Sequence, residues 1–71
     1  MALVTTLEKN RKEKQAVHKP TRCLSSVFEA EGRRYIQLDT YGSDEREHPE
    51  KVSQSIQFDR QAATQLLDFL T

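Results

Sequence analysis

The stretch GRRYIQLDTYGSD, residues 32–44, decides the fold because its side chains alternate. Apolar Ile36 and Leu38 are separated by one residue and belong to one row of side chains, and the residues at the alternate positions form a second row. A period of two is that of a β-strand, in which successive side chains point to opposite faces. We expect the first row to face a core and the second to face water: Arg33, Tyr35, Gln37, Asp39 and Tyr41.

The residues on either side of Gly32 predict a β-hairpin, for which two registers compete. A two-residue loop would put Phe28 beside Tyr35. A three-residue loop, with Gly32 in the left-handed conformation, would gather the large apolar residues on one face: Leu24, Phe28, Ile36 and Leu38. We predict the three-residue loop, because it unites these residues and because glycine suits its last position.

Three other segments complete the expected architecture. The Thr5-x-x-Glu8 pattern resembles a capping box and predicts a short charged helix from about residue 6 to 16. Residues 42–51, GSDEREHPEK, have the composition of a solvated loop. Residues 52–59, VSQSIQFD, alternate as a half-buried third strand, and Asp59 is a suitable N-cap for an amphipathic helix after it.

The fold class is therefore α+β, a β-β-β-α unit with an antiparallel sheet of three or four strands and a C-terminal helix. We assign residues 1–20 to a charged N-terminal helix or flexible tail and residues 21–71 to the domain. A chain of this size buries only about 60% of its unfolded surface, and the helix has an apolar arc of about 160°, more than one sheet needs. We expect a homodimer whose interface contains Leu66, Leu67, Phe69 and Leu70.

Catalytic and metal-binding constellations are missing from the sequence. Cys23, His18 and His48 have no paired spacing, and the glycines Gly32 and Gly42 are too isolated to cradle a phosphate. The carboxylates of residues 44–50 are more typical of a solvated charge run than of an acid/base pair. We predict no catalytic residue, no metal, no cofactor and no small-molecule substrate.

Charge and cysteine content limit the cellular compartment and the kinds of partner that we expect. One cysteine cannot form an internal disulfide, and no apolar run of signal-peptide or membrane length is present, so we expect a cytoplasmic protein. The net charge is zero, but residues 1–34 hold eight Lys or Arg against four acids, and residues 35–71 hold three against seven. This asymmetry is compatible with a nucleic-acid partner and equally with attraction between subunits.

The outward row of the middle strand favours binding of single-stranded DNA or RNA. It interleaves cations, aromatic rings and amides, a mixture in which rings stack on bases and cations follow phosphates. We assign phosphate contacts to Arg22, Arg33, Arg34 and Lys51, stacking to Tyr35 and Tyr41, and hydrogen bonds to Gln37, Ser53 and Ser55. The main alternative is a protein-interaction or regulatory module without nucleic-acid binding, since tyrosines are common on exposed strands. A strand-helix-helix repressor would require more helix than sheet.

The final strand and helix also resemble a known family. The run Gln54-Ser55-Ile56-Gln57-Phe58, followed by Asp59 and a helix with Leu66 and Leu67, is similar to the single-stranded DNA-binding domain of the transcriptional positive cofactor four family. The resemblance covers roughly residues 21–71. It implies a curved antiparallel sheet followed by a helix, dimerisation through that region, and single-stranded nucleic-acid binding in transcription, replication or repair.

Overall fold

The computed structural model describes residues 1–42 and 51–71 and has an α+β fold. Four strands precede one helix: β1 (Ala2–Val4), β2 (Cys23–Ala30), β3 (Arg33–Tyr41), β4 (Val52–Asp59) and α1 (Arg60–Leu70). The predicted sheet followed by a C-terminal helix is confirmed, and strands contain more residues than the helix. The described residues therefore do not have a strand-helix-helix arrangement. The predicted loop over 42–51, with His48 and its carboxylates, lies largely outside them.

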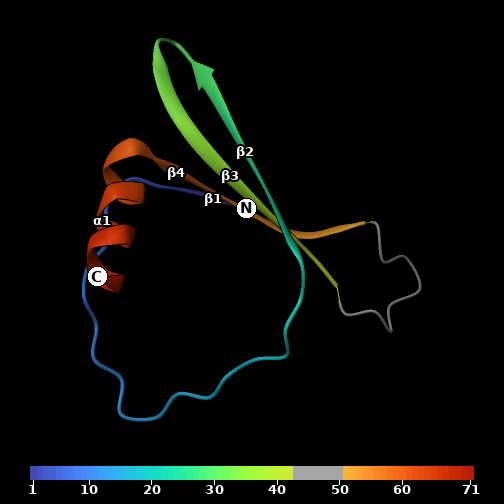
Figure 1. Cartoon of the computed structure of the whole chain (residues 1–71), viewed down its shortest axis with the longest axis vertical. Helices are drawn as coiled ribbons and strands as arrows, with labels where there is room; N and C mark the ends of the chain where they lie inside the picture. Colours follow the sequence, from blue (N-terminus) through green and yellow to red (C-terminus); the bar gives the residue numbers. More distant parts are fainter. Residues whose placement is uncertain (43–50) are drawn as a thin grey trace.

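The sheet is mixed, not purely antiparallel, and its strand order is β1-β4-β3-β2. β2, β3 and β4 pair antiparallel, whereas β1 runs parallel to β4 with Ala2 opposite Ile56 and Val4 opposite Phe58. In Figure 1 the β2–β3 hairpin extends toward the top of the view. Residues 5–22 pass from the end of β1, beside the helix, through a wide loop to the start of β2.

The predicted N-terminal helix from about residue 6 to 16 is wrong, because no helix forms there. That segment has too few apolar side chains to pack a helix against the sheet, so tertiary contacts decide its path. The apolar start of the chain instead adds a strand to the edge of β4. Beyond it, the Leu7 amide donates to Gln65 Oε1 at 2.9 Å, and Lys9 Nζ lies 5.3 Å from the centre of the Phe69 ring.

The predicted three-residue hairpin loop is also wrong. Ala30 pairs with Arg33, so only Glu31 and Gly32 connect the strands. Both have positive φ, 52° and 77°, which is the requirement of a type I′ turn. Such a turn matches the right-handed twist of the two strands, and this local geometry prevails over the apolar grouping that the longer loop would give.

The two-residue turn redistributes the side chains between the two faces of the sheet. Phe28 lies opposite Tyr35, and Val27 lies opposite Ile36. Leu24 and Phe28 therefore share a face with the outward row, contrary to our expectation. We call this the polar face: Leu3, Leu24, Phe28, Arg33, Tyr35, Gln37, Asp39, Ser55 and Gln57. The other is the apolar face: Val4, Val27, Ile36, Leu38, Ile56 and Phe58.

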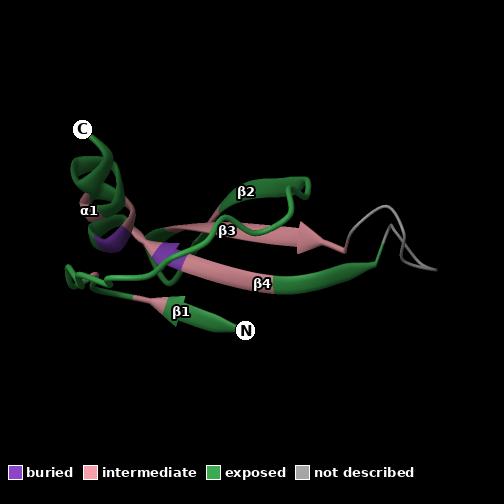
Figure 2. Ribbon diagram, turned by 90° about the horizontal axis from the view of Figure 1, so that it is seen from below, coloured by how far each residue is buried: buried purple, intermediate pink, exposed green. Residues whose placement is uncertain are grey.

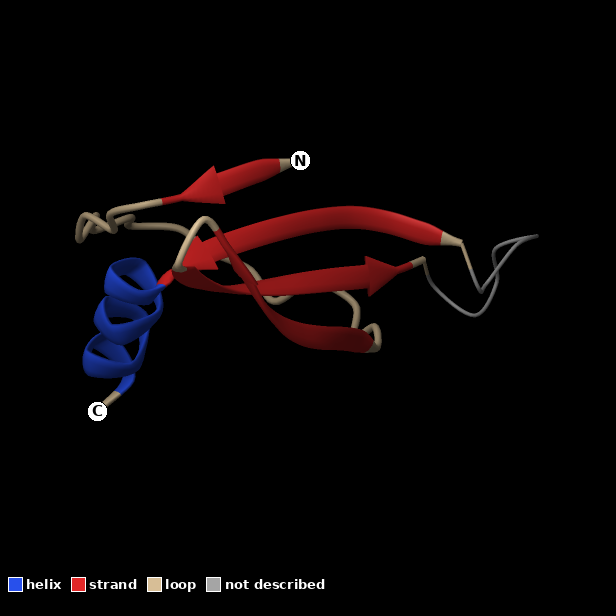
Figure 3. Cartoon of the chain, turned by 90° about the horizontal axis from the view of Figure 1, so that it is seen from above, coloured by secondary structure: helices blue, strands red, loops and turns tan. Residues whose placement is uncertain are grey.

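Helix α1 stands at one end of the sheet, where β4 ends (Figures 2 and 3). Asp59 caps it as predicted: its backbone is extended and its Oδ1 accepts the Ala62 amide at 2.9 Å. Within residues 1–42 and 51–71, the buried apolar residues are confined to this junction, with Phe58 7% exposed and Ala62 fully buried. The helix leaves most of both sheet faces uncovered.

The whole chain is accordingly open. Its Cα radius of gyration is 14.3 Å, against about 11 Å for a compact domain of this length. Its accessible surface is 6687 Å², whereas the size scaling of folded monomers gives roughly 4,500 Å². The arm of residues 5–22, in which every residue except Leu7 is exposed, contributes to this excess.

We predict that substitutions at the two turn positions change the free energy of unfolding in opposite directions. Glu31→Asn should raise the free energy of unfolding by about 1 kcal/mol, because asparagine tolerates the left-handed conformation better than glutamate. Gly32→Ala should lower it by about 1–2 kcal/mol through the backbone, since an added Cβ would meet no atom within 4 Å. Urea denaturation measures both. A three-residue loop would give Glu31 a negative φ, and Glu31→Asn would then bring no gain.

Candidate interaction surfaces

A ladder of polar side chains crosses the polar face between β4 and β3. Gln57 Nε2 donates to Gln37 Oε1 at 2.8 Å, and Gln37 Nε2 donates to Asp39 Oδ1 at 2.9 Å. Ser55 Oγ donates to the same carboxylate oxygen at 2.6 Å. The ladder exists because the antiparallel register sets Gln37 opposite Gln57 and Asp39 opposite Ser55.

The ladder fixes the charge at the centre of this face. The hydrogen bond from Ser55, and secondarily that from Gln37, lowers the pKa of Asp39, against a small opposing effect of desolvation. Asp39 therefore stays ionised at neutral pH. Gln37 and Ser55, which we assigned to nucleic-acid contacts, are already bonded to their neighbours, and the anion they hold would repel a phosphate nearby.

Aromatic rings and arginines lie toward the two ends of β3. Phe28 and Tyr35 stack with their centroids 5.4 Å apart and their planes 25° apart, and Arg33 lies on the same face. At the other end the Arg22 guanidinium lies 4.5 Å from the centre of the Tyr41 ring. The structure thus pairs each predicted stacking tyrosine with a ring or cation of its own chain.

The remaining predicted contacts are dispersed. Arg34 lies on the apolar side of the sheet and forms an ion pair with Glu29 at 3.2 Å, in which both side chains are well exposed. Lys51 and Ser53 are exposed at the beginning of β4. The predicted set is therefore not one continuous surface: Arg33, Tyr35, Gln37 and Ser55 share a face, and Arg34 does not join them.

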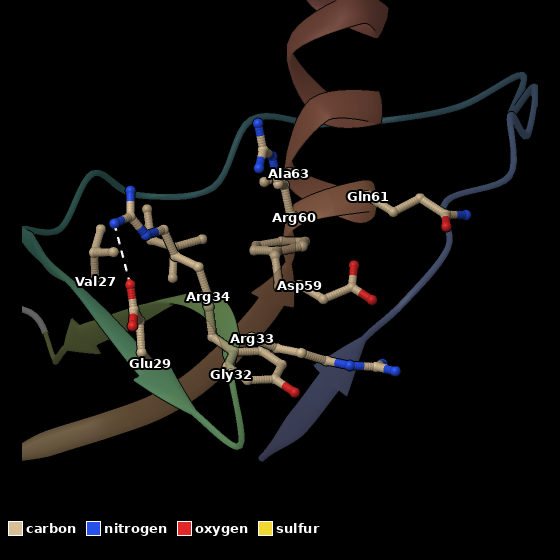
Figure 4. Close-up of a pocket in the computed structure, with 12 residues that line it drawn as sticks. Val27, Glu29, Gly32, Arg33, Arg34, Asp59, Arg60, Gln61 and Ala63 are labelled. Carbon is tan, nitrogen blue, oxygen red and sulfur yellow. Dashed lines mark hydrogen bonds and ion pairs between the residues drawn. The ribbon is translucent and has the colours of Figure 1, made fainter.

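A second surface, which the sequence analysis missed, lies between the hairpin and the first turn of α1 (Figure 4). This hairpin–helix groove has a volume of about 830 Å³. Its lining is mixed: apolar Val27, Ile36, Phe58 and Ala63, the arginines Arg33, Arg34 and Arg60, and also Glu29, Gly32, Tyr35, Asp59 and Gln61. Of its two carboxylates, Glu29 is paired with Arg34 and Asp59 accepts the helix-capping hydrogen bond. Because three arginines face two carboxylates, the lining has a formal charge of +1.

The apolar lining continues along the helix. Ala63, Leu67 and Leu70 follow one another at the spacing that aligns residues on one side of an α-helix. We call them the helix strip. Leu67 is 66% exposed and Leu70 is 81% exposed. The other two residues predicted for an interface, Leu66 and Phe69, are less exposed and lie toward Ala62 and the N-terminal arm.

No protein-family model, curated protein or solved structure matches the chain. Within the described ranges, no group of three or more His, Cys, Asp or Glu side chains could hold a metal ion. Those ranges also hold no helix long and apolar enough to cross a membrane.

The polar ladder makes stability depend on pH in a defined direction. The folded-state pKa of Asp39 is lowered, so its hydrogen bonds contribute stability above the unfolded-state pKa of about 3.9 that is lost as the pH falls through the folded value. Ser55→Ala should raise the pKa of Asp39 in a carbon-detected NMR titration, and Asp39→Asn should flatten the acid limb of the stability curve. Asp68→Asn removes a charge away from the ladder and is the control. An unmoved Asp39 pKa in Ser55→Ala would contradict the ladder.

Proposed function

We propose that this chain is a protein-interaction module that binds an apolar, acid-flanked segment of another polypeptide in the hairpin–helix groove. The observation that carries this proposal is the helix strip, which begins at Ala63 in the wall of the groove and continues along the same side of α1 with two exposed leucines. Contiguous exposed apolar surface of this kind marks binding sites in soluble proteins. Occupation of the groove would cover the strip and complete the small core around Phe58.

The charges around the groove define the chemistry of the partner. Val27 and Ile36 supply the apolar floor of the groove. Arg60 projects from the first turn of α1, and the Arg34 guanidinium is directed toward Glu29 on the hairpin (Figure 4). An amphipathic segment lying on that floor would bring its polar edge to the guanidinium groups. An acidic residue at that edge would pair with Arg60, whereas a basic one would be repelled by it. The single cysteine and the sequence composition support a cytoplasmic location, which we include in the proposal.

Site-specific photo-crosslinking in cells tests the groove. A benzophenone side chain at position 67 or 70 should give one discrete crosslinked product, because both positions lie along the occupied strip, whereas position 64 on the polar side should give none. Mass spectrometry should map the product to an apolar segment with flanking acids. Equal products at positions 64 and 67, or none at positions 67 and 70, would contradict the proposal.

Substitution within the helix strip gives a quantitative check. Leu67→Asp combined with Leu70→Asp should weaken binding of the identified segment by roughly tenfold or more, since central apolar anchors dominate such interfaces. The same change should alter the free energy of unfolding by less than about 0.5 kcal/mol, because both side chains are exposed. Thr64→Asp is the matched control. Loss of folding in the double variant would show that the leucines serve the core.

A second candidate function is binding of single-stranded nucleic acid by the polar face. The observation that favours it is the stacked Phe28–Tyr35 pair beside Arg33, which offers an aromatic surface and a cation together. The similarity of residues 21–71 to the transcriptional positive cofactor four family supports the same candidate and would place it in transcription, replication or repair. The ionised Asp39 and the ladder-bound amides weigh against it, so we rank it second.

Fluorescence anisotropy with a labelled thymidine oligomer at low salt tests this candidate. Binding should weaken as salt rises, and Arg33→Ala with Tyr35→Ala should reduce affinity roughly tenfold or more through lost stacking and charge. Arg34→Ala removes the same charge from the opposite face and should have a smaller effect. An equal loss in both variants would indicate nonspecific attraction to positive charge, and no binding by the native chain would eliminate the candidate.

A further inference from the structure

Among the described residues, no strand pairs with the outer edge of β2. β2 is the last strand in the order β1-β4-β3-β2, and all its residues except Phe28 are exposed. It pairs with β3 over eight consecutive residues without a bulge. An open edge presents unpaired backbone amides and carbonyls, which are a template for another strand.

The two-residue turn determines which backbone groups face outward. In such a hairpin the residues flanking the turn, Ala30 and Arg33, exchange hydrogen bonds with each other. Every second residue of β2 back from Ala30 therefore bonds to β3. The alternate residues direct their amides and carbonyls away from the sheet, and these are Cys23, Ser25, Val27 and Glu29.

The usual protection of an edge strand is missing from β2. Natural edges carry lysine, proline, a bulge or a covering segment. The sequence CLSSVFEA has no lysine or proline, and its one charged residue, Glu29, is paired with Arg34 of the neighbouring strand. At the opposite side of the sheet, by contrast, β1 covers part of the β4 edge.

We propose that β2 pairs antiparallel with β2 of a second copy of this chain, around a two-fold axis at Ser26. In this register Ser26 lies opposite the partner's Ser26, and Leu24 lies opposite the partner's Phe28. All four outward-facing residues then exchange hydrogen bonds, so none of the exposed backbone groups of β2 is left unpaired. The two four-stranded sheets become one sheet of eight strands.

The side chains select this register over its neighbours. Leu24 is 54% exposed and lies on the same face of β2 as Phe28, with Ser26 between them. Only the register centred on Ser26 sets Leu24 against the partner's Phe28, giving two symmetric apolar contacts at the interface. A shift of two residues in either direction sets Leu24 against a serine or an alanine. The small Ser26 side chains meet on the axis without crowding.

This interface uses the backbone groups of Val27 and Glu29, whose side chains line the hairpin–helix groove, but no residue of the helix strip. It is argued from the open edge of β2 and does not depend on the proposed function. It also differs from the helix-centred dimer expected from the sequence. The dimer would carry two grooves, one at each end of a continuous sheet.

Engineered cysteines test the register. In a Cys23→Ser background, Ser26→Cys should form an intermolecular disulfide under mild oxidation, because directly opposed residues of a non-hydrogen-bonded pair have Cα atoms about 4.5 Å apart, within disulfide range. Ser25→Cys in the same background is the matched control, since it would lie more than about 8 Å from the partner's Ser25. Equal crosslinking of the two variants, or none in either, would overturn the proposal.

The mass in solution gives an independent check. Light scattering should report a dimer for the native chain and a monomer for Ser25→Pro, because that change removes an outward amide that no bond within the chain uses. Circular dichroism should show retained secondary structure. Leu67→Asp should leave the dimer intact, which separates this interface from the groove. A native monomer at high micromolar concentration, or a dimer lost in Leu67→Asp and kept in Ser25→Pro, would refute the pairing.

Discussion

The tight turn at Glu31 and Gly32 is the constraint on which the rest of the structure depends. Two residues with positive φ close the hairpin, and the length of the turn decides which side chains of β2 share a face with β3. One more residue in the loop would have exchanged the two sets. The stacked Phe28 and Tyr35, the apolar floor of the groove and the outward-facing amides of β2 all follow from this count.

The small size of the hydrophobic interior is the second feature that shapes this structure. A helix that lies flat across a sheet can bury a whole face, but α1 stands at the end of β4 and encloses only the junction at Phe58 and Ala62. The chain therefore keeps apolar residues in water on the helix, on β2 and on the floor of the groove. A domain with this distribution gains stability by association, because partners supply the burial that a short chain lacks.

Local patterns were sufficient to predict much of this fold. Alternation identified β3 and β4, and Asp59 marked the beginning of α1, because these signals depend on neighbouring residues. The turn register was mispredicted because two local preferences conflicted, and the twist of the hairpin prevailed. β1 was missed because its partner lies more than fifty residues away, and three apolar residues carry no periodic signal.

For the candidate surfaces too, features set by neighbouring residues could be predicted from the sequence, and features that join distant segments could not. Alternation correctly placed Arg33, Tyr35 and Gln37 on one face, but it could not show that Gln57 and Ser55 would occupy the hydrogen-bonding capacity of that row. The groove joins the hairpin to the helix, so only tertiary structure reveals it. The sequence showed that the apolar arc of the helix is too wide to pack against one sheet. It did not show which of the helix leucines would lie toward Ala62 and which would face water.

The parallel pairing of β1 with β4 sets the order in which this chain can fold. Ala2 has no partner until Ile56 has been synthesised and β4 has joined β3. Closing so long a loop for three residue pairs costs entropy that only a preformed edge can offset. Of the four strands, the first to be synthesised is thus the last to dock, and until then β4 remains a second open edge of the sheet.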